Sequence, residues 1–99
     1  MAEKIGIAMV GAGAFGEFCL KAFSGVEGIK ITAVVDTRLE QAQRLASQYG
    51  ADAYPDMEPM LARPDIAIVT LSTPPYLHGE QGLGALNSGK HLFCEKPLA

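Results

Sequence analysis

The chain has 99 residues, 48% of them hydrophobic, and a formal net charge of −3. This length suits one domain with a buried core and leaves no room for a second independent domain. Lys and Arg form no run in the sequence, so the basic surface typical of proteins that bind nucleic acids or membrane surfaces is not expected, and a small molecule is the expected partner.

The first 25 residues have the pattern of a strand followed by a helix. Residues 5–10 are a short apolar run that ends at Gly11, as in a parallel strand covered on both faces. Residues 15–23 then carry apolar side chains at helical spacing and predict a helix that ends near Gly25. The side chains expected to form its apolar stripe are Phe15, Phe18, Cys19, Ala22 and Phe23.

The next elements repeat this alternation. Residues 31–35 are rich in β-branched side chains and predict a second strand, which is followed by a second helix over residues 38–49. Residues 51–54 predict a short third strand, and Asp56 is placed to cap a brief helix that runs to residue 61.

The last third of the chain predicts a strand, a helix and a strand. The strands cover residues 66–71 and 91–94, and the helix between them opens with Pro74 and Pro75 and ends near residue 86. Its three glycines indicate either very close packing on the sheet or local irregularity; they are Gly79, Gly82 and Gly84. Because strands alternate with helices, the expected fold is α/β with a doubly wound parallel sheet.

The two cysteines are expected to be core residues. Cys19 and Cys94 lie among apolar residues, without the spacing of a metal site, which suits the reducing cytoplasm. The apolar run at the start of the chain is too short and too interrupted to predict a signal peptide or a membrane span.

A glycine-rich loop lies between the first strand and the first helix. Residues 11–16 read GAGAFG, the pattern GxGxxG. In this pattern Gly11 permits a tight turn, Gly13 lets a pyrophosphate approach the backbone, and Gly16 lets the helix pack close to the strand. The free amides at the helix start, including those of Ala14 and Phe15, favour an anion. These residues predict a dinucleotide site in a Rossmann-type sheet of order 3-2-1-4-5.

An acidic residue ends the second strand. Asp36 lies about 20 residues past the glycines, where a dinucleotide site places a carboxylate on the ribose hydroxyls. We therefore expect NAD, with Asp36, Thr37 and Arg38 at the ribose, and a weaker affinity for NADP because Asp36 would repel a 2′-phosphate. Arg38 could offset part of that repulsion. The alternative is that Asp36 only caps the following helix.

Two further groups of polar residues follow the fourth and fifth strands. Leu71, Ser72, Thr73 and Pro74 lead into the helix that contains His78, and the switch point of the sheet would bring this loop opposite the glycine loop. The hydroxyls of this loop are expected on the nicotinamide side of the cofactor. For His78, packing in the first turn of the helix is an equally good interpretation.

The second group is Glu95, Lys96 and Pro97, which follow the last strand. A lysine at this edge is placed to stabilise negative charge on a substrate oxygen, which makes Lys96 the candidate catalytic residue, with Glu95 and Lys96 both beside the cofactor. An isolated exposed lysine is usually only solvated, but all these polar groups are expected at one edge of the sheet.

Together these motifs resemble the amino-terminal domain of the Gfo/Idh/MocA oxidoreductases. The matching positions are residues 11–16, Asp36, Thr73 and Pro74 with His78, and residues 89–91 leading to 95–98. The resemblance implies an NAD(P)-dependent enzyme that transfers hydride at a sugar, polyol or related carbinol. It also implies that Lys96 lies near the nicotinamide, and often a cis peptide before Pro97.

Family members are more than twice as long as this chain. The resemblance therefore implies that residues 1–99 are an incomplete Rossmann domain of a truncated chain or gene fragment, lacking the last strand and the substrate domain with its acid/base residue. The open edge of the fifth strand predicts association with another copy. Two other functions stay open: a stand-alone NAD-binding regulatory or interaction module, and the cofactor domain of an NAD-dependent glycoside hydrolase.

Overall fold

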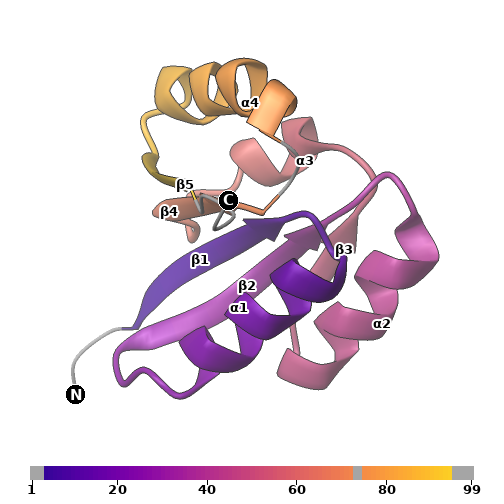
Figure 1. The fold of residues 1–99 in the computed structure, drawn as a ribbon. Coiled ribbons are helices and arrows are strands. Elements are labelled where there is room, and N and C mark those ends of the chain that lie inside the picture. Colours follow the sequence, from indigo (N-terminus) through magenta and orange to yellow (C-terminus); the bar gives the residue numbers. More distant parts are fainter. Residues whose placement is uncertain (1–3, 73–74, 95–99) are drawn as a thin grey trace.

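The computed structural model of the chain describes residues 4–72 and 75–94, without the side chains of residues 75–78, 80 and 94. Within these ranges it contains one five-stranded parallel sheet in the order β3-β2-β1-β4-β5. The strands are β1 (Ile5–Val10), β2 (Ile29–Val35), β3 (Asp52–Tyr54), β4 (Ile68–Leu71) and β5 (His91–Cys94). The predicted α/β class and strand order are confirmed (Figure 1).

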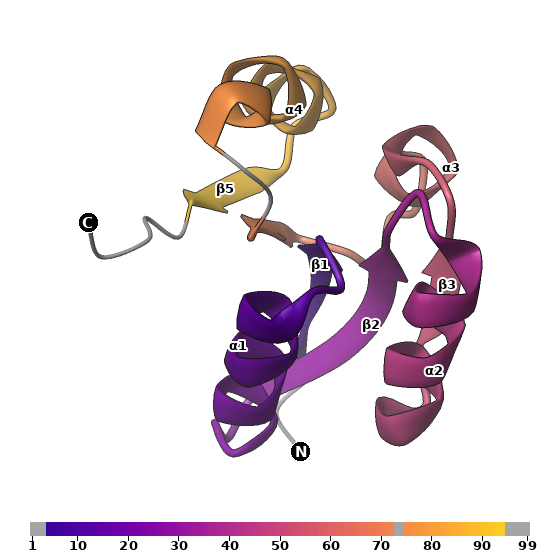
Figure 2. The same cartoon turned by 45° about the vertical axis from the view of Figure 1, so that its right-hand side comes forward.

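Helices cover both faces of the sheet (Figures 1 and 2). They are α1 (Ala14–Ser24), α2 (Leu39–Tyr49), α3 (Met57–Leu61) and α4 (Pro75–Asn87). Ile7 and Met9 of β1 pack with α1 and α2 in one core, whereas Ala8 and Val10 belong to the core under α3 and α4. Because alternate residues of a strand point to opposite faces, a strand buried on both sides has the continuous apolar run seen in residues 5–10.

The apolar stripe predicted for α1 is correct for Cys19, which is buried, and for Phe23, which packs against the core, but it is wrong for Phe15, Phe18 and Ala22, which are exposed. Phe15 and Phe18 are 41% and 68% exposed and stack on each other, with ring centroids 6.5 Å apart. The buried residues are Gly16, Cys19 and Leu20. The reason is the close approach of Gly16 to the turn after β1, described below, which fixes the rotation of the helix and leaves both phenylalanine rings outside the core.

The three glycines of α4 do not interrupt the helix, and one of them, Gly82, allows close packing on the sheet. A Cβ on Gly82 would lie 3.0 Å from Leu92 Cδ2 of β5, so the missing side chain lets the helix approach the sheet. Asp56 precedes α3 as predicted, but its side chain makes no capping hydrogen bond. Cys19 is buried, as expected.

The amino ends of the strands are joined by a polar network. Arg63, in the turn between α3 and β4, contacts Asp65 at 2.6 Å, Asp52 at 2.6 Å and the Tyr54 hydroxyl at 3.2 Å. The buried Lys90 donates from Nζ to the carbonyls of Arg63 (2.6 Å) and Ile66 (2.7 Å). This network holds the turn before β4 against the starts of β3 and β5.

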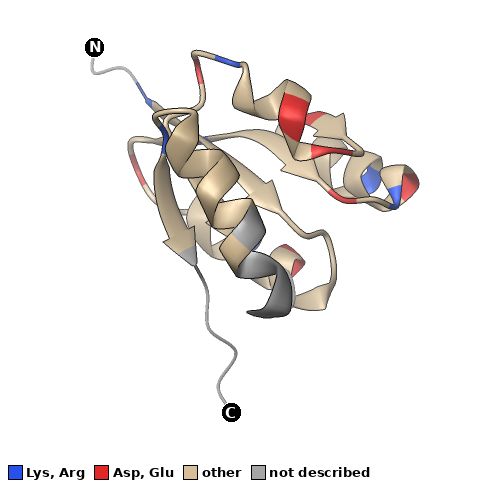
Figure 3. Ribbon diagram, turned by 90° about the horizontal axis from the view of Figure 1, so that it is seen from above, with Lys and Arg blue, Asp and Glu red and all other residues tan. Residues whose placement is uncertain are grey.

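In the view of Figure 3, Lys and Arg are spread over the described chain and interspersed with Asp and Glu. No helix in the described ranges is both long and apolar enough to cross a membrane.

Candidate dinucleotide site at the carboxyl edge of the sheet

The turn after β1 has a conformation that favours glycine. Gly11 has a φ of +106°, a region that L side chains rarely adopt, and its N–H donates to the Val35 carbonyl of β2 at 2.7 Å. This bond ties the start of the loop to the end of the neighbouring strand. The glycine loop, residues 11–16, therefore turns sharply at the carboxyl edge of the sheet and leads directly into α1.

The other two glycines of the loop differ in their surroundings. A Cβ on Gly16 would lie 2.2 Å from the Gly11 carbonyl oxygen, so the close helix packing predicted for Gly16 is confirmed. Around Gly13 a Cβ would meet no atom within 4 Å of the described chain. The space above Gly13 lets a ligand approach the backbone closely, as a pyrophosphate requires.

The amino end of α1 suits an anion. Gly13 occupies the position before the helix, so no side chain there caps the first-turn amides. The first hydrogen bond of the helix runs from Glu17 N to the Gly13 carbonyl at 2.9 Å, which leaves the amides of Ala14, Phe15 and Gly16 without an intrahelical acceptor. Together with the positive end of the helix dipole, these donors fit the diphosphate of a dinucleotide.

Asp36 joins the two βα turns of this edge. Its Oδ2 accepts from the Ala12 N–H and its Oδ1 from the Arg38 N–H, both at 2.8 Å. The Arg38 guanidinium lies 3.3 Å from Oδ1 and is largely exposed, whereas the Asp36 side chain is 11% exposed. The residue in the capping position of α2 is Arg38 rather than Asp36. The interpretation of Asp36 as only a helix cap therefore does not describe its contacts.

These contacts keep Asp36 ionised. Burial by itself would raise the pKa of the carboxyl, but hydrogen bonds from the N–H groups of Arg38 and Ala12, and the Arg38 guanidinium, together lower the pKa below its ordinary value of 3.8. At neutral pH the Asp36 carboxylate is therefore negatively charged beside the glycine loop.

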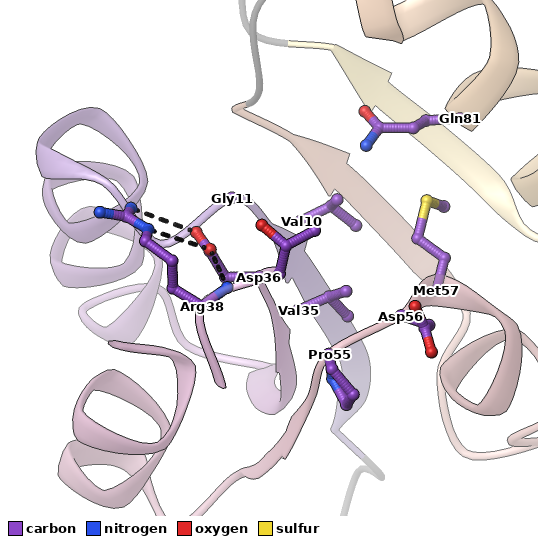
Figure 4. Close-up of a pocket in the computed structure, with 10 residues that line it drawn as sticks. Val10, Gly11, Val35, Asp36, Arg38, Pro55, Asp56, Met57 and Gln81 are labelled. Carbon is purple, nitrogen blue, oxygen red and sulfur yellow. Dashed lines mark hydrogen bonds and ion pairs between the residues drawn. The ribbon is translucent and has the colours of Figure 1, made fainter. Parts of the chain in front are cut away.

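A cavity of about 380 Å³ opens next to Asp36 (Figure 4). Its lining comes from the ends of β1 and β2, the turn before α2, the loop between β3 and α3, and α4. The residues are Val10, Gly11, Val35, Asp36, Thr37, Arg38, Pro55, Asp56, Met57 and Gln81. Val10, Val35, Pro55 and Met57 supply apolar surface beside the Asp36 carboxylate, and this combination suits a flat aromatic base joined to a ribose.

Ser72, which follows β4, supports the glycine loop. Its hydroxyl is within hydrogen-bond distance of the carbonyls of Gly11 (3.0 Å) and Val10 (3.2 Å), and its N–H donates to Val10 at 2.9 Å. The side chain of Leu71 is fully buried in the core. The Ser72 hydroxyl thus contacts the glycine loop itself. The expectation that this hydroxyl lies toward the nicotinamide does not describe its contacts.

Several predicted site residues cannot be placed. Thr73, Pro74, Glu95 and Lys96 lie outside the described residues, as does the peptide before Pro97, and the side chain of His78 is not described either. His91 starts β5 opposite Ile68, at the amino end of the sheet and away from the candidate site, as expected from the sequence.

Sequence reasoning missed contributions from three segments, one of which is α4, where Gln81 lines the cavity. Pro55, Asp56 and Met57 reach the cavity because they follow β3, whose carboxyl end lies at the same edge as those of β1 and β2. Because β3 runs parallel to β2, the shared edge of their carboxyl ends is the sequence signal that indicates this contribution. Gln41 of α2 also contacts the glycine loop, and no sequence pattern indicates this contact.

Comparison with known proteins identifies the family. Residues 5–99 match the model of the Gfo/Idh/MocA family, described as an oxidoreductase family with an NAD-binding Rossmann fold. The chain belongs to the Gfo/Idh/MocA oxidoreductase family. The resemblance drawn from the motifs, and the expectation of an NAD-binding fold, are therefore confirmed.

Three relatives illustrate the range of this family. The chain is 42% identical over 94 residues to 4-carboxy-2-hydroxymuconate-6-semialdehyde dehydrogenase of Sphingobium sp., covering 94% of the chain and 30% of that protein. A glycosyl hydrolase family 109 protein of Shewanella amazonensis is 33% identical, covering 99% of the chain and 24% of that protein. The structure of myo-inositol dehydrogenase from Lactobacillus casei, in complex with NAD(H) and myo-inositol, superposes with a TM-score of 0.87 at 30% identity, covering 97% of the chain and 29% of that chain.

The chain thus spans at most about 30% of the length of these relatives.

Proposed function

We propose that residues 1–99 bind NAD along the carboxyl edge of the sheet, in a protein that transfers hydride between the nicotinamide and a carbinol of a sugar, polyol or related substrate. The observation that carries the proposal is the Asp36 carboxylate, which is bonded to the Ala12 N–H of a GxGxxG loop at the end of the neighbouring strand. A ribose beside Asp36 would have its diphosphate over this loop.

Each part of NAD has a proposed place. The diphosphate lies over Gly11 and Gly13 and meets the amides of Ala14, Phe15 and Gly16. The adenosine ribose donates its hydroxyls to Asp36, and the adenine enters the apolar cavity beside Thr37 and Arg38. Because the exposed Arg38 guanidinium occupies acceptor positions of the Asp36 carboxylate, we expect it to move aside as the ribose binds.

The nicotinamide end extends toward the loop after β4. We propose that the backbone of Leu71 and Ser72 lines it, together with Thr73, Pro74 and His78 from the start of α4, because the Leu71 side chain is buried and the Ser72 hydroxyl is bonded to the glycine loop. The support is the strand order, since β4 lies next to β1 and its carboxyl end faces the glycine loop across the switch point of the sheet.

The same carboxylate favours NAD over NADP. Two like charges 4 Å apart repel by about 4 kcal/mol at an effective dielectric constant of 20, so a 2′-phosphate beside Asp36 is disfavoured. A swing of Arg38 toward the phosphate would recover part of this energy. We expect NAD to bind at least about tenfold tighter than NADP, which corresponds to about 1.4 kcal/mol.

Calorimetric titration with NAD⁺ and NADP⁺ tests this site. Asp36→Asn keeps the shape of the side chain and removes the charge, so the ratio of the two dissociation constants should move toward one. Gly13→Val fills the space above the loop and should abolish binding of both nucleotides. Gly25→Val is the matched control, because a Cβ there makes only an ordinary contact at 3.6 Å at the far end of α1. Equal affinities for NAD⁺ and NADP⁺ in the unaltered protein would refute the proposed role of Asp36.

Catalysis is assigned to Lys96 as a proposal. A lysine that follows β5 leaves the sheet at the same carboxyl edge, where its ammonium group can stabilise negative charge on the substrate oxygen during hydride transfer. Together with Glu95 it would border the nicotinamide. In the whole protein, Lys96→Ala should lower kcat by roughly 100-fold or more, the range of losses for a lost charge-stabilising donor, with the affinity for NAD⁺ nearly unchanged. An unchanged kcat would remove Lys96 from the mechanism.

The substrate pocket is proposed to lie in a separate part of the protein, because the chain spans only about a third of its relatives. The kinship with a glycosyl hydrolase family 109 protein supports an alternative in which the same site serves glycoside cleavage. The two are told apart by incubating the whole protein with NAD⁺. A dehydrogenase accumulates NADH with a polyol, whereas a hydrolase releases the aglycone of a glycoside without net reduction.

We further propose that the protein forms homo-oligomers through the edge of the sheet and works in the cytoplasm. β5 is an edge strand of the described sheet, and Phe93 in it is 49% exposed. Pairing or association would cover this edge. The buried Cys19 thiol fits a reducing compartment.

A further inference from the structure

Ala12, in the middle of the glycine loop, is held by side chains from outside the loop. The residue is fully buried, and its N–H donates to Asp36 Oδ2 at 2.8 Å. Its carbonyl oxygen accepts from Gln41 Nε2 at 2.7 Å. Both backbone groups of one residue are therefore bonded to side chains of the next βα unit, one from the end of β2 and one from α2.

The orientation of the Gln41 amide is set by its other neighbour. Arg44, one turn further along α2, donates from Nε to Gln41 Oε1 at 3.2 Å. Because a guanidinium only donates hydrogen bonds, the oxygen of the Gln41 amide must face Arg44 and the NH₂ group must face the Ala12 carbonyl. Arg44 in turn contacts Glu17, in the first turn of α1, at 3.3 Å. A chain of contacts thus runs from α1 through Arg44 and Gln41 back to the loop that precedes α1.

This chain matters because the bonds of Gly11 to Val35 and Ser72 hold only the start of the loop, whereas Gln41 holds the residue next to Gly13. Glycine loses more backbone freedom on ordering than any other residue, and Gly13 has no atoms around its missing side chain. A loop that is already fixed before the ligand arrives binds it more tightly than one that must be ordered at that moment. The bonds to Ala12 fix the backbone immediately before Gly13 while leaving the amides at the start of α1 open.

We propose that Gln41 is a positioning residue for the dinucleotide site: it holds the glycine loop in its binding conformation, and Arg44 sets the direction of its amide. The inference rests on the proposed NAD site. Gln41 does not line the cavity beside Asp36, so it acts through Ala12.

The first test compares Gln41→Met with Gln43→Met, an exposed glutamine of the same helix. Methionine keeps the length of the side chain and removes its donor. In the whole protein we expect Gln41→Met to raise the dissociation constant for NAD⁺ about fivefold, which is the loss of one neutral hydrogen bond of about 1 kcal/mol. The Gln43→Met protein should stay within about twofold of the unaltered protein, a change too small for a lost hydrogen bond.

Amide hydrogen exchange without NAD⁺ separates positioning from general stability. Gln41→Met should speed exchange in residues 11–14 and leave the strands of the sheet unchanged. Unchanged affinity and loop exchange would overturn the inference, and so would faster exchange throughout β1 and β2, which indicates general destabilisation. If the unaltered protein binds no NAD⁺, the proposed function fails, and the exchange of residues 11–14 still decides whether Gln41 fixes the loop.

A double-mutant cycle tests the role of Arg44. If Arg44 acts by orienting Gln41, then Arg44→Met should weaken NAD⁺ binding in the unaltered protein and have little effect when Gln41→Met is already present. Effects that simply add would show that Arg44 acts independently, for example through its charge, and would remove it from the proposal.

Discussion

At the amino end of the sheet Lys90 donates to the carbonyls of Arg63 and Ile66, whereas at the carboxyl end Asp36 and Gln41 bond both backbone groups of Ala12. At both ends, side chains thus form hydrogen bonds with backbone groups. At the amino end the bonds close the turn before β4. At the carboxyl end they fix one residue and leave the amides that follow Gly13 without a side-chain cap.

We therefore expect the amino edge of the sheet to contribute to stability and the carboxyl edge to ligand binding. The carboxyl edge collects the turns that lead into helices, and their free amides are useful only if they stay open. At the amino edge no amide has to stay open for a ligand, so the Arg63 guanidinium can pair with both Asp52 and Asp65. Hydrogen bonds with Asp65 raise the pKa of Arg63 against the opposing effect of burial, and Tyr54 and Asp52 add to the rise. Changes at the two edges should therefore affect different measurements.

The largest effect is expected for Gly16→Ala. Its Cβ would overlap the Gly11 carbonyl oxygen at 2.2 Å, so α1 must move away from the loop, at a cost of roughly 3 kcal/mol in the free energy of unfolding. NAD⁺ affinity should fall at least about tenfold, because the amides of the first turn move with the helix. Urea unfolding and calorimetry measure the two effects, with Gly25→Ala as control. An unchanged free energy of unfolding and an unchanged NAD⁺ affinity would show that the loop can shift at little cost to make room for the Cβ.

A smaller effect, on stability alone, is expected for Lys90→Met. The change removes the ammonium donor from the carbonyls of Arg63 and Ile66, and the Arg63 carbonyl keeps only the long bond from the Ile66 N–H at 3.5 Å. It should lower the free energy of unfolding by about 1–3 kcal/mol. NAD⁺ affinity should stay unchanged at temperatures where the protein remains folded, because Lys90 lies at the opposite edge. Lys30→Met, at an exposed lysine near the same edge, is the control. A loss of NAD⁺ affinity as large as that of Gly16→Ala would contradict the expected difference between the two edges.

The smallest effect is a dependence of stability on pH. Because folding lowers the pKa of Asp36 below 3.8, this residue contributes stability that is fully present above that pH and is lost as the pH falls through the folded value. Urea unfolding of the unaltered protein and of Asp36→Asn, which cannot titrate, should therefore differ more at pH 6 than below pH 3.8. A difference that stays constant over this range would contradict the proposed ionisation.

Much of this arrangement could be predicted because local patterns agree with the fold. The apolar runs and helical spacing predicted all nine described elements, and the GxGxxG loop and Asp36 lie together at the carboxyl edge of the sheet, as expected. The prediction failed for part of the stripe of α1, since two exposed phenylalanines fit the helical period as well as the buried residues do. It also failed for the Asp56 cap, whose side chain makes no such bond.

The sequence by itself determined the alternation of strands and helices, the tight turn at Gly11 and the carboxylate at the end of β2, because each depends on residues close together in the chain. Only the tertiary structure decided the rotation of α1 and the contacts that Gln41 and Ser72 make with the glycine loop. Those contacts join residues that are 29 and 61 positions apart. Their partners are defined by how the second and fourth βα units pack beside the first, which no local pattern specifies.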